Sequence, residues 1–401
     1  MEGLKLLVVF ILIMVLLMRR APLGPVMLGG SVLLAILYRT SPGAFLGMVW
    51  RATQNPATIE LLAILTSIML LEHLLGKEGY LEKMLKGLRG LFQDRRVIMA
   101  LIPAFIGLMP SAGGAIFSAP LVGQAAASGG IAAEEKSFVN YYYRHIWEYF
   151  LPLYPGVLLA SRLSGLPLPH LITALAPYGL LVVLLGLPIL WRLPPLKEEE
   201  EGPGERLIRA KEFFTGTLPI LVVLALSLIA QIEVGLAVGT VVAVLLIRHR
   251  YNPSKLWHLC REAITVKTLV LVWGIMVFKQ VLVDTKAVES LPPLLGRLPV
   301  PGFLVFGFLS FLVGMLTGLM AAFVGITFPL ITASMGDQLG LPLVVFVFIA
   351  GFTGTMLSPL HLCLVLTVDF FKADVRKVFR LLVGPEIALM TIALLGYLFR
   401  I

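Results

Sequence analysis

Ionisable side chains stand close together in one otherwise apolar segment, NYYYRHIWEYFLPLYPG, which begins at Asn140. Arg144 and Glu148 are four residues apart, and His145 and Glu148 are three apart, so a helix would place them on one face. A guanidinium binds anions, and a histidine titrates near neutral pH. The spacing predicts a ligand site at Asn140 and Arg144, with His145 and Glu148 as ion-coupling groups. A self-neutralising, purely structural Arg144–Glu148 pair is the alternative.

A second polar stretch, GFTGTMLSPLHLCLVLT, is loosened as a helix by Gly354 and Pro359. Its polar side chains are Thr353, Thr355, Ser358 and His361. Hydroxyl oxygens and freed carbonyl oxygens are hard ligands that suit a small cation such as sodium. We assign Thr355 and Ser358 to ligand binding, and Thr353 and His361 to ion coupling. A hydrogen-bonded structural role for His361 stays open.

Two further segments interrupt their apolar runs with small residues. In IGLMPSAGGAIFSAP, Pro110 ends a helix, Gly113 and Gly114 permit a tight reversal, and Ser111 supplies a hydroxyl. The next helix would start near Gly114, and its N-terminal dipole favours an anion. We therefore predict that Ser111, Gly113 and Gly114 contact the ligand, although small residues also serve helix packing. The matching segment TGLMAAFVGITFP offers Thr327 as a coupling group.

The elements that must position these residues are membrane-spanning helices. Of the 401 residues, 58% are hydrophobic and 14% are charged, which exceeds what a soluble core can bury. Apolar runs near the roughly 20 residues that cross a bilayer cover 3–18, 21–38, 58–76, 170–191, 213–230, 233–248, 264–282 and 381–399. The formal charge of +9 is spread over loops, so we expect no nucleic-acid partner.

The basic loops predict the topology. We place Arg19 and Arg20 in the cytoplasm, and the positive-inside rule then places the basic loops at 77–96, 248–261 and 372–380 there too. Counting the spans shows that this requires an even number of crossings in two segments. The segments 97–130 and 301–336 must each enter and leave the membrane on one face, as re-entrant hairpins. Both termini of this multi-pass chain are then external. The Pro-, Gly- and Glu-rich segment 192–211 is expected to be a cytoplasmic linker.

Short matches recur at a nearly constant distance along the chain. Gly107-Leu108-Met109 recurs 211 residues later, Pro120-Leu121 recurs after 209 residues and Pro152-Leu153 after 207. The chain therefore divides into repeats at 1–191 and 212–401. We expect an all-α polytopic membrane protein whose repeats each contain five transmembrane helices and one re-entrant hairpin. An odd number of crossings inverts the second repeat, and the broken helices are 137–164 and 341–370.

The segments GLMPSAGGAIFSAP, NYYYRHIWEYFLPLYPG and GFTGTMLSPLHLCLVLT together resemble an integral-membrane family grouped with the ion transporter superfamily. Relatives there include divalent-anion/sodium symporters, gluconate-type permeases and sodium/proton antiporters. The resemblance implies a homodimer and elevator-type movement. The hairpin tips read PSAGG and MAAFVG where the dicarboxylate symporters carry Ser-Asn-Thr, so the resemblance does not extend to dicarboxylate specificity.

The leading hypothesis is a secondary active transporter in the inner (plasma) membrane. It would carry a small organic or inorganic anion coupled to sodium or protons. A sodium/proton or other cation antiporter is the first alternative, and an intramembrane enzyme or a non-transporting scaffold is another. No GxxxxGK[ST] or HExxH motif occurs, and Cys260 and Cys363 are far apart. We therefore predict no enzyme, no resident metal and no cofactor beyond a candidate sodium ion, and expect Cys363 to serve packing.

Overall fold

The fold is all-helical in the computed structural model. The structure describes residues 2–19, 21–92, 94–108, 114–127, 130–195, 203–287, 300–335 and 339–399. The elements of the first half are α1 (Glu2–Met18), α2 (Leu23–Leu37), α3 (Pro42–Gln54), α4 (Pro56–Lys77), α5 (Tyr80–Leu91), α6 (Arg95–Ile106), α7 (Gly114–Ala125), α8 (Ala133–Arg144), α9 (Pro155–Ser164) and α10 (Leu168–Arg192). The predicted all-α class is confirmed for these ranges.

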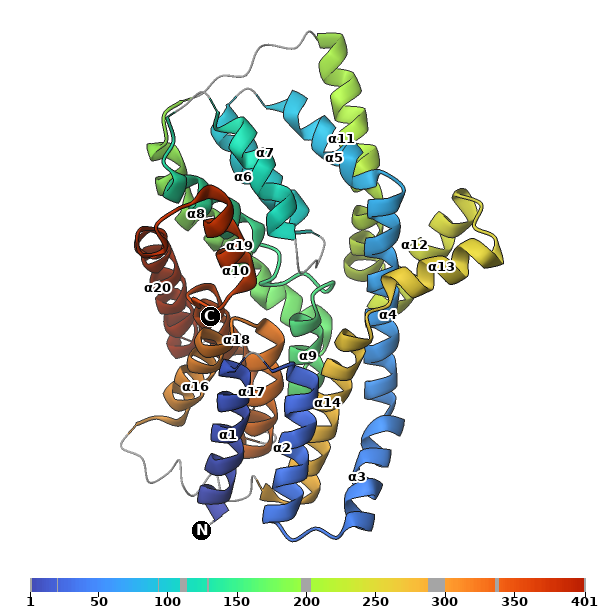
Figure 1. Cartoon of the computed structure of the whole chain (residues 1–401), viewed down its shortest axis with the longest axis vertical. Coiled ribbons are helices and arrows are strands. Elements are labelled where there is room, and N and C mark those ends of the chain that lie inside the picture. The colour runs from blue at the N-terminus through green and yellow to red at the C-terminus, as the bar shows by residue number, and fades with distance from the viewer. Residues whose placement is uncertain are drawn as a thin grey trace.

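The second half repeats the same kinds of element (Figure 1). Its elements are α11 (Pro203–Leu224), the π-helix η1 (Ala225–Ile229), α12 (Val234–Arg248), α13 (Pro253–Ala263), α14 (Val266–Asp284), α16 (Gly302–Thr317), α17 (Met320–Met335), α18 (Leu341–Met356), α19 (Leu362–Phe371) and α20 (Val375–Phe399). Helix α11 begins inside the segment 192–211, so the end of that segment is helical. Helix α20 likewise includes much of the basic segment 372–380.

Within the part of the chain that the structure describes, five helical segments are long and apolar enough to cross a membrane. They are Pro56–Lys77, Leu168–Arg192, Glu205–Ser227, Val266–Asp284 and Val375–Phe399. Large apolar side chains are exposed along them, as lipid contact requires. The helices are those of a membrane protein.

The helices of the two halves follow one another in the same order at matching distances. Helices α2 and α12 begin at residues 23 and 234, and α3 and α13 begin at 42 and 253, a separation of 211 in each case. Helices α9 and α19 begin at 155 and 362, and α10 and α20 at 168 and 375, a separation of 207. The short matches in the sequence thus fall on equivalent elements.

The contacts between the halves are reciprocal. Helix α2 packs on α14 while α4 packs on α12, and α7 packs on α19 while α9 packs on α17. Helix α8 packs on α20 while α10 packs on α18. Each contact therefore has a counterpart in which the two halves exchange roles. A pseudo-two-fold relation between two copies of one unit produces this pattern of contacts.

Helices α3 and α13 are the equivalent amphipathic helices of the two halves. Each begins with a proline at its first turn, and the side chains of Ser41 and Asn252 cap their N-termini. Trp50 on α3 is 62% exposed and Trp257 on α13 is 68% exposed. Figure 1 shows α13 projecting sideways from the other helices. Exposed tryptophans on amphipathic helices suit the membrane–water interface.

The two predicted broken helices are interrupted. In the first, α8 ends at Arg144, a turn region follows, and Pro155 starts α9. In the second, α18 ends at Met356 and α19 begins at Leu362. Pro359 lies three residues after the end of α18, where a proline prevents the helix from continuing. Pro152 and Pro155 lie in and at the end of the first break, but α8 ends eight residues before Pro152.

The segments 97–130 and 301–336 each form two short helices that pack against each other, α6 with α7 and α16 with α17. A left-handed glycine, Gly318 (φ 63°), ends α16 two residues before α17 begins. Only glycine adopts this backbone conformation without strain. The second segment thus reverses where the sequence places a glycine.

Candidate functional site

The first break carries a buried group of ionisable side chains. Arg144 is 1% exposed, His145 is not exposed and Glu148 is 9% exposed. A guanidinium nitrogen of Arg144 lies 3.7 Å from Glu148 Oε1, and His145 Nε2 lies 3.7 Å from the same oxygen. The predicted proximity is confirmed, but the predicted helical face is wrong. Because α8 ends at Arg144, His145 and Glu148 lie in the turn that follows.

Tyr141 connects the two breaks. Its hydroxyl donates to the carbonyl oxygen of Met356, at 3.0 Å, and lies 2.9 Å from Nδ1 of His361. The same nitrogen is 3.1 Å from the carbonyl oxygen of Thr355. A carbonyl oxygen can only accept, so a proton on Nδ1 of His361 satisfies both of its contacts. Residues far apart in the sequence thus form one buried polar centre.

The two histidines of the breaks lie against each other. The ring centroids of His145 and His361 are 4.8 Å apart, and the ring of Tyr141 contacts both. Nδ1 of His145 lies 2.6 Å from the carbonyl oxygen of Tyr141, which likewise requires a proton on Nδ1. The two predicted coupling histidines therefore belong to one cluster.

Asn140 lies next to Tyr141 on α8 and bonds to two other elements. Its amide donates to the hydroxyl of Thr367, at 2.9 Å, and to the carbonyl oxygen of Ala115, at 3.4 Å. These bonds connect α8 to α19 and α7. Asn140 thus joins the α6–α7 pair to both broken helices, and no contact in the structure joins it to Thr355 or Ser358.

The hydroxyl groups predicted in the second segment are buried, and two of them bond locally. The hydroxyl of Thr355 donates to the carbonyl oxygen of Gly351, and that of Ser358 accepts from the backbone N–H of Leu360. Thr353 is also buried on α18. What Thr355 contributes to the polar centre is its carbonyl oxygen, which contacts His361.

Of the small-residue segments, Ser111 and Gly113 lie outside the described residues. Gly114 is the first residue of α7, the predicted start of the next helix. Thr327 lies within α17, where its hydroxyl accepts from Ser310 and donates to the carbonyl oxygen of Phe323. Thr327 thus joins α16 to α17, and no contact in the structure joins it to the histidines.

The repeated glycines Gly107 and Gly318 pack against the two breaks. A Cβ at Gly107 would lie 2.0 Å from the carbonyl oxygen of Arg144, and one at Gly318 would lie 2.7 Å from the nitrogen of His361. Tyr154 also donates to the carbonyl oxygen of Gly107. The glycine of each repeated Gly-Leu-Met match therefore allows its helix pair to approach the broken helix of its own half.

Two residues of this region, Tyr141 and Glu386, were not predicted from the sequence, and Cys363 was predicted to serve packing. Glu386 is 1% exposed on α20, and its carboxylate accepts from the hydroxyl of Tyr149 at 3.5 Å. An acidic residue inside an apolar span is by itself a signal of a functional site. Cys363 carries no such signal, because a lone cysteine in an apolar helix is indistinguishable from a packing residue.

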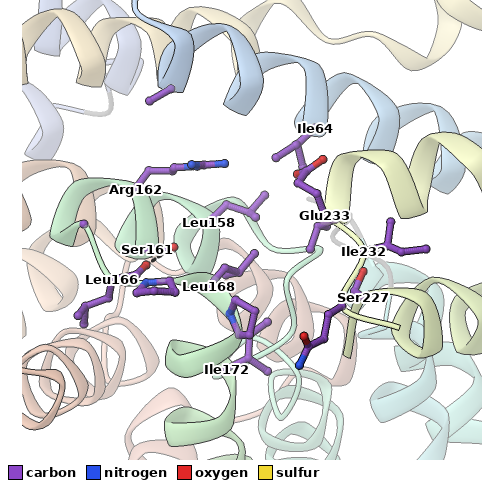
Figure 2. Close-up of a pocket in the computed structure, with 16 residues that line it drawn as sticks. Ile64, Leu158, Ser161, Arg162, Leu166, Leu168, Ile172, Ser227, Ile232 and Glu233 are labelled. Atoms are coloured by element: carbon purple, nitrogen blue, oxygen red, sulfur yellow. Dashed lines mark hydrogen bonds between the residues drawn. The ribbon is translucent and has the colours of Figure 1, made fainter. Parts of the chain in front are cut away.

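A cavity of about 330 Å³ lies elsewhere, between α4, α9, α10 and the start of α12. Figure 2 shows Arg162 and Glu233 at this cavity, with Ile64 of α4 opposite Leu158 of α9. Arg162 also donates to the carboxylate of Glu60 on α4. None of the predicted ligand or coupling residues that the structure describes lines this cavity.

Fold and site together define a helical membrane protein of two equivalent halves whose interrupted helices share a buried polar centre. The chain matches the family described as "Protein of unknown function (DUF401)" over residues 3–400 and belongs to that family. A search among curated proteins found no match.

Proposed function

We propose that this protein is a secondary active transporter of a small anion. The observation that carries the proposal is the pair of interrupted helices whose breaks meet at the Tyr141–His361 contact. Interrupted helices leave backbone groups that lipid cannot satisfy, so they persist only inside protein or beside a wet path. Secondary carriers place their binding sites at such breaks.

Arg144 supports an anionic substrate. It is the last residue of α8, it is buried, and its guanidinium stays protonated at all physiological pH values. A buried permanent cation in a membrane protein is costly and marks a functional site by default. A planar guanidinium also suits carboxylates and oxyanions such as phosphate or sulfate. We assign Arg144 to the substrate and Glu148 and His145 to the coupling ion.

The reciprocal contacts between the halves support an inverted repeat. In this proposal, α6–α7 and α16–α17 are re-entrant hairpins of opposite entry, both termini are external, and the protein lies in the inner membrane as a homodimer. Two equivalent, oppositely oriented halves can exchange conformations, which gives inward-open and outward-open states from one design.

The contact pattern also supports elevator-type movement of one helix group against another. Helices α2, α4, α12 and α14 pack among themselves, and the interrupted helices pack with α7, α17 and α20. Where the groups meet, Arg162 of α9 pairs with Glu60 of α4, and Lys279 of α14 donates to the carbonyl oxygen of Arg162 at 3.5 Å. The cavity at Arg162 lies on this boundary.

A cation antiporter is the second candidate function, and the buried carboxyl groups of Glu148 and Glu386 favour it. Carboxyl groups at membrane depth exchange protons and bind cations in pumps and antiporters. The two candidates predict different flux. An anion carrier moves labelled anion, whereas an antiporter acidifies or alkalinises vesicles when sodium is added.

Counterflow in proteoliposomes tests the proposal. Vesicles containing the protein are loaded with unlabelled succinate, gluconate, sulfate or phosphate, and uptake of the same labelled anion is measured under imposed sodium or proton gradients. A carrier shows transient accumulation of the labelled anion above its equilibrium level when the vesicles are preloaded with unlabelled anion. A channel shows flux without accumulation, and an enzyme shows product without flux. Either outcome, or no flux of any anion, would contradict the proposal.

A further inference from the structure

Three buried side chains in the polar centre form a group of metal-ligand type. One ring nitrogen each of His145 and His361 and the sulfur of Cys363 lie within 4.8 Å of one another. His145 is not exposed, and His361 and Cys363 are each 7% exposed. No metal site was predicted from the sequence, in which His145 lies more than 200 positions before His361 and Cys363. The interrupted helices bring them together.

The hydrogen bonds of the two imidazoles leave one ring nitrogen of each without a proton. Nδ1 of His145 faces the carbonyl oxygen of Tyr141, and Nδ1 of His361 faces that of Thr355. Both protons therefore sit on Nδ1, which leaves the Nε2 lone pairs available. Nε2 of His145 is buried and has no hydrogen-bond partner. Metal-binding histidines characteristically donate their other N–H to a carbonyl or carboxylate.

We propose that His145, His361 and Cys363 bind a soft monovalent cation, Cu(I). Thiolate and imidazole ligands select soft or borderline metals, so sodium and magnesium do not fit this ligand set. Metal bonds of about 2.3 Å to sulfur and about 2.0 Å to nitrogen place trigonal ligands roughly 3.5–3.8 Å apart. The three atoms need to approach by about 1 Å, which small side-chain rotations supply.

Charge balance selects Cu(I) over Zn(II). When Cu(I) binds, the Cys363 thiol forms a sulfur–copper bond and releases one proton to the medium. The resulting Cu(I), thiolate and two neutral imidazoles carry no net charge. Zn(II) would leave a net charge of +1 on the ion and its three ligands, and the nearby Glu148 carboxylate already lies beside the opposite charge of Arg144. This assignment gives His145 and His361 the role of metal ligands in place of the ion-coupling role considered for them above.

The site does not depend on the proposed transport function, because it requires only the three ligands. A bound ion would be held by both interrupted helices, because His145 lies in the first break and Cys363 lies on α19. A bound ion therefore links the two halves at their centre. We expect Cu(I) to raise the unfolding temperature, whether or not any anion is transported.

The test uses the full-length protein, purified in detergent and reconstituted in lipid nanodiscs. Cu(I), generated from Cu(II) with ascorbate, is buffered with bicinchoninate, and bound metal is measured against protein. The expected result is one copper ion per chain and an X-ray absorption spectrum with one sulfur and two nitrogen neighbours. A copper shell without sulfur would overturn the proposal, and this result requires no variant.

Cysteine variants locate the site. Cys363→Ser should weaken Cu(I) binding at least a hundredfold and abolish the rise in unfolding temperature, and Cys260→Ser, which changes the other cysteine, should leave both unchanged. Equal binding by the two variants would overturn the assignment. Zn(II) that binds at these residues as tightly as Cu(I) would overturn the choice of ion. Size-exclusion chromatography verifies that each variant is folded, and Cys363→Ala replaces the serine variant if it is not.

Discussion

The hydroxyl of Tyr141 lies 2.9 Å from Nδ1 of His361, so a residue of α8 contacts the N-cap residue of α19 across 220 positions of sequence. Both residues are buried, and the same hydroxyl also donates to the carbonyl oxygen of Met356, where α18 ends. One phenol thus connects the ends of three half-helices. The polar centre depends on this contact more than on any helix by itself.

Replacing Tyr141 with phenylalanine should weaken transport more than it weakens folding. Tyr141→Phe removes the hydroxyl and leaves a buried carbonyl oxygen at Met356 without this donor, at a cost of about 1–3 kcal/mol. Tyr142→Phe is the matched control, because its buried hydroxyl donates to the carbonyl oxygen of Val182 within the first half. We expect similar losses in unfolding temperature, with counterflow reduced only by Tyr141→Phe. Equal transport by the two variants would show that the contact is structural.

Gly318 should tolerate no side chain. Gly318→Ala would place a Cβ 2.7 Å from the backbone nitrogen of His361 at a residue with φ 63°. The left-handed conformation alone costs about 1–2 kcal/mol, and the close contact adds to this cost. Gly239→Ala is the control, since nothing lies within 4 Å of a Cβ at this position of α12. Gly318→Ala should lower the unfolding temperature and Gly239→Ala should raise it slightly. An unchanged unfolding temperature for Gly318→Ala would contradict the packing described.

Asp94 should stabilise the start of α6 in a pH-dependent way. Its carboxylate accepts from the backbone N–H of Arg96 and from the Arg96 side chain, which lowers its pKa below the usual value. A depressed pKa gives stability that is present above the pKa of the unfolded chain, near 3.9, and is lost as the pH falls through the lower native pKa.

Asp94→Ala should therefore lower the free energy of unfolding by about 1 kcal/mol at neutral pH, as the loss of a helix cap does. The difference from the unaltered protein should stay constant from pH 7 to pH 5 and shrink at lower pH. Asp94→Asn should retain part of the cap at all pH values. Thermal unfolding across this range provides the measurement, and a difference that grows on acidification would refute the assigned direction.

Some parts of this fold could be predicted from the sequence, and others could not. The repeated short matches lie on helices that begin at matching positions, because the separation between these helices changes only from 211 to 207 residues along the chain. Prolines predicted both interruptions, but the first interruption begins well before its prolines. The grouping of His145 with His361 and Cys363 could not be predicted, since it depends on packing between halves. Glu386 was predictable from its charge within an apolar span, but proximity to Tyr149 was not.

The Glu60–Arg162 pair should influence the rate of conformational exchange. It joins α4 to α9, and both side chains are about one-third exposed, so removing it should shift the equilibrium by at most about 1 kcal/mol, or fivefold. We expect Glu60→Gln and Arg162→Gln to alter the exchange rate similarly, and the double variant to match either single one. Half-saturation should be unchanged. Additive effects in this double-mutant cycle would indicate that the two residues act separately.

The anion-binding role of Arg144 is tested most directly by the concentration dependence of counterflow. Arg144→Gln alone would leave Glu148 buried without its cationic neighbour, so the informative variant combines Arg144→Gln with Glu148→Gln, which removes both charges together. Because Glu148 is itself assigned to the coupling ion, this double variant is compared with Glu148→Gln alone, and the difference between the two reports on Arg144. The account predicts that the double variant remains folded in the membrane and that its half-saturating anion concentration is at least tenfold above that of Glu148→Gln. Unchanged half-saturation with a lower unfolding temperature would contradict the account, because Arg144 would then serve the fold and not the substrate.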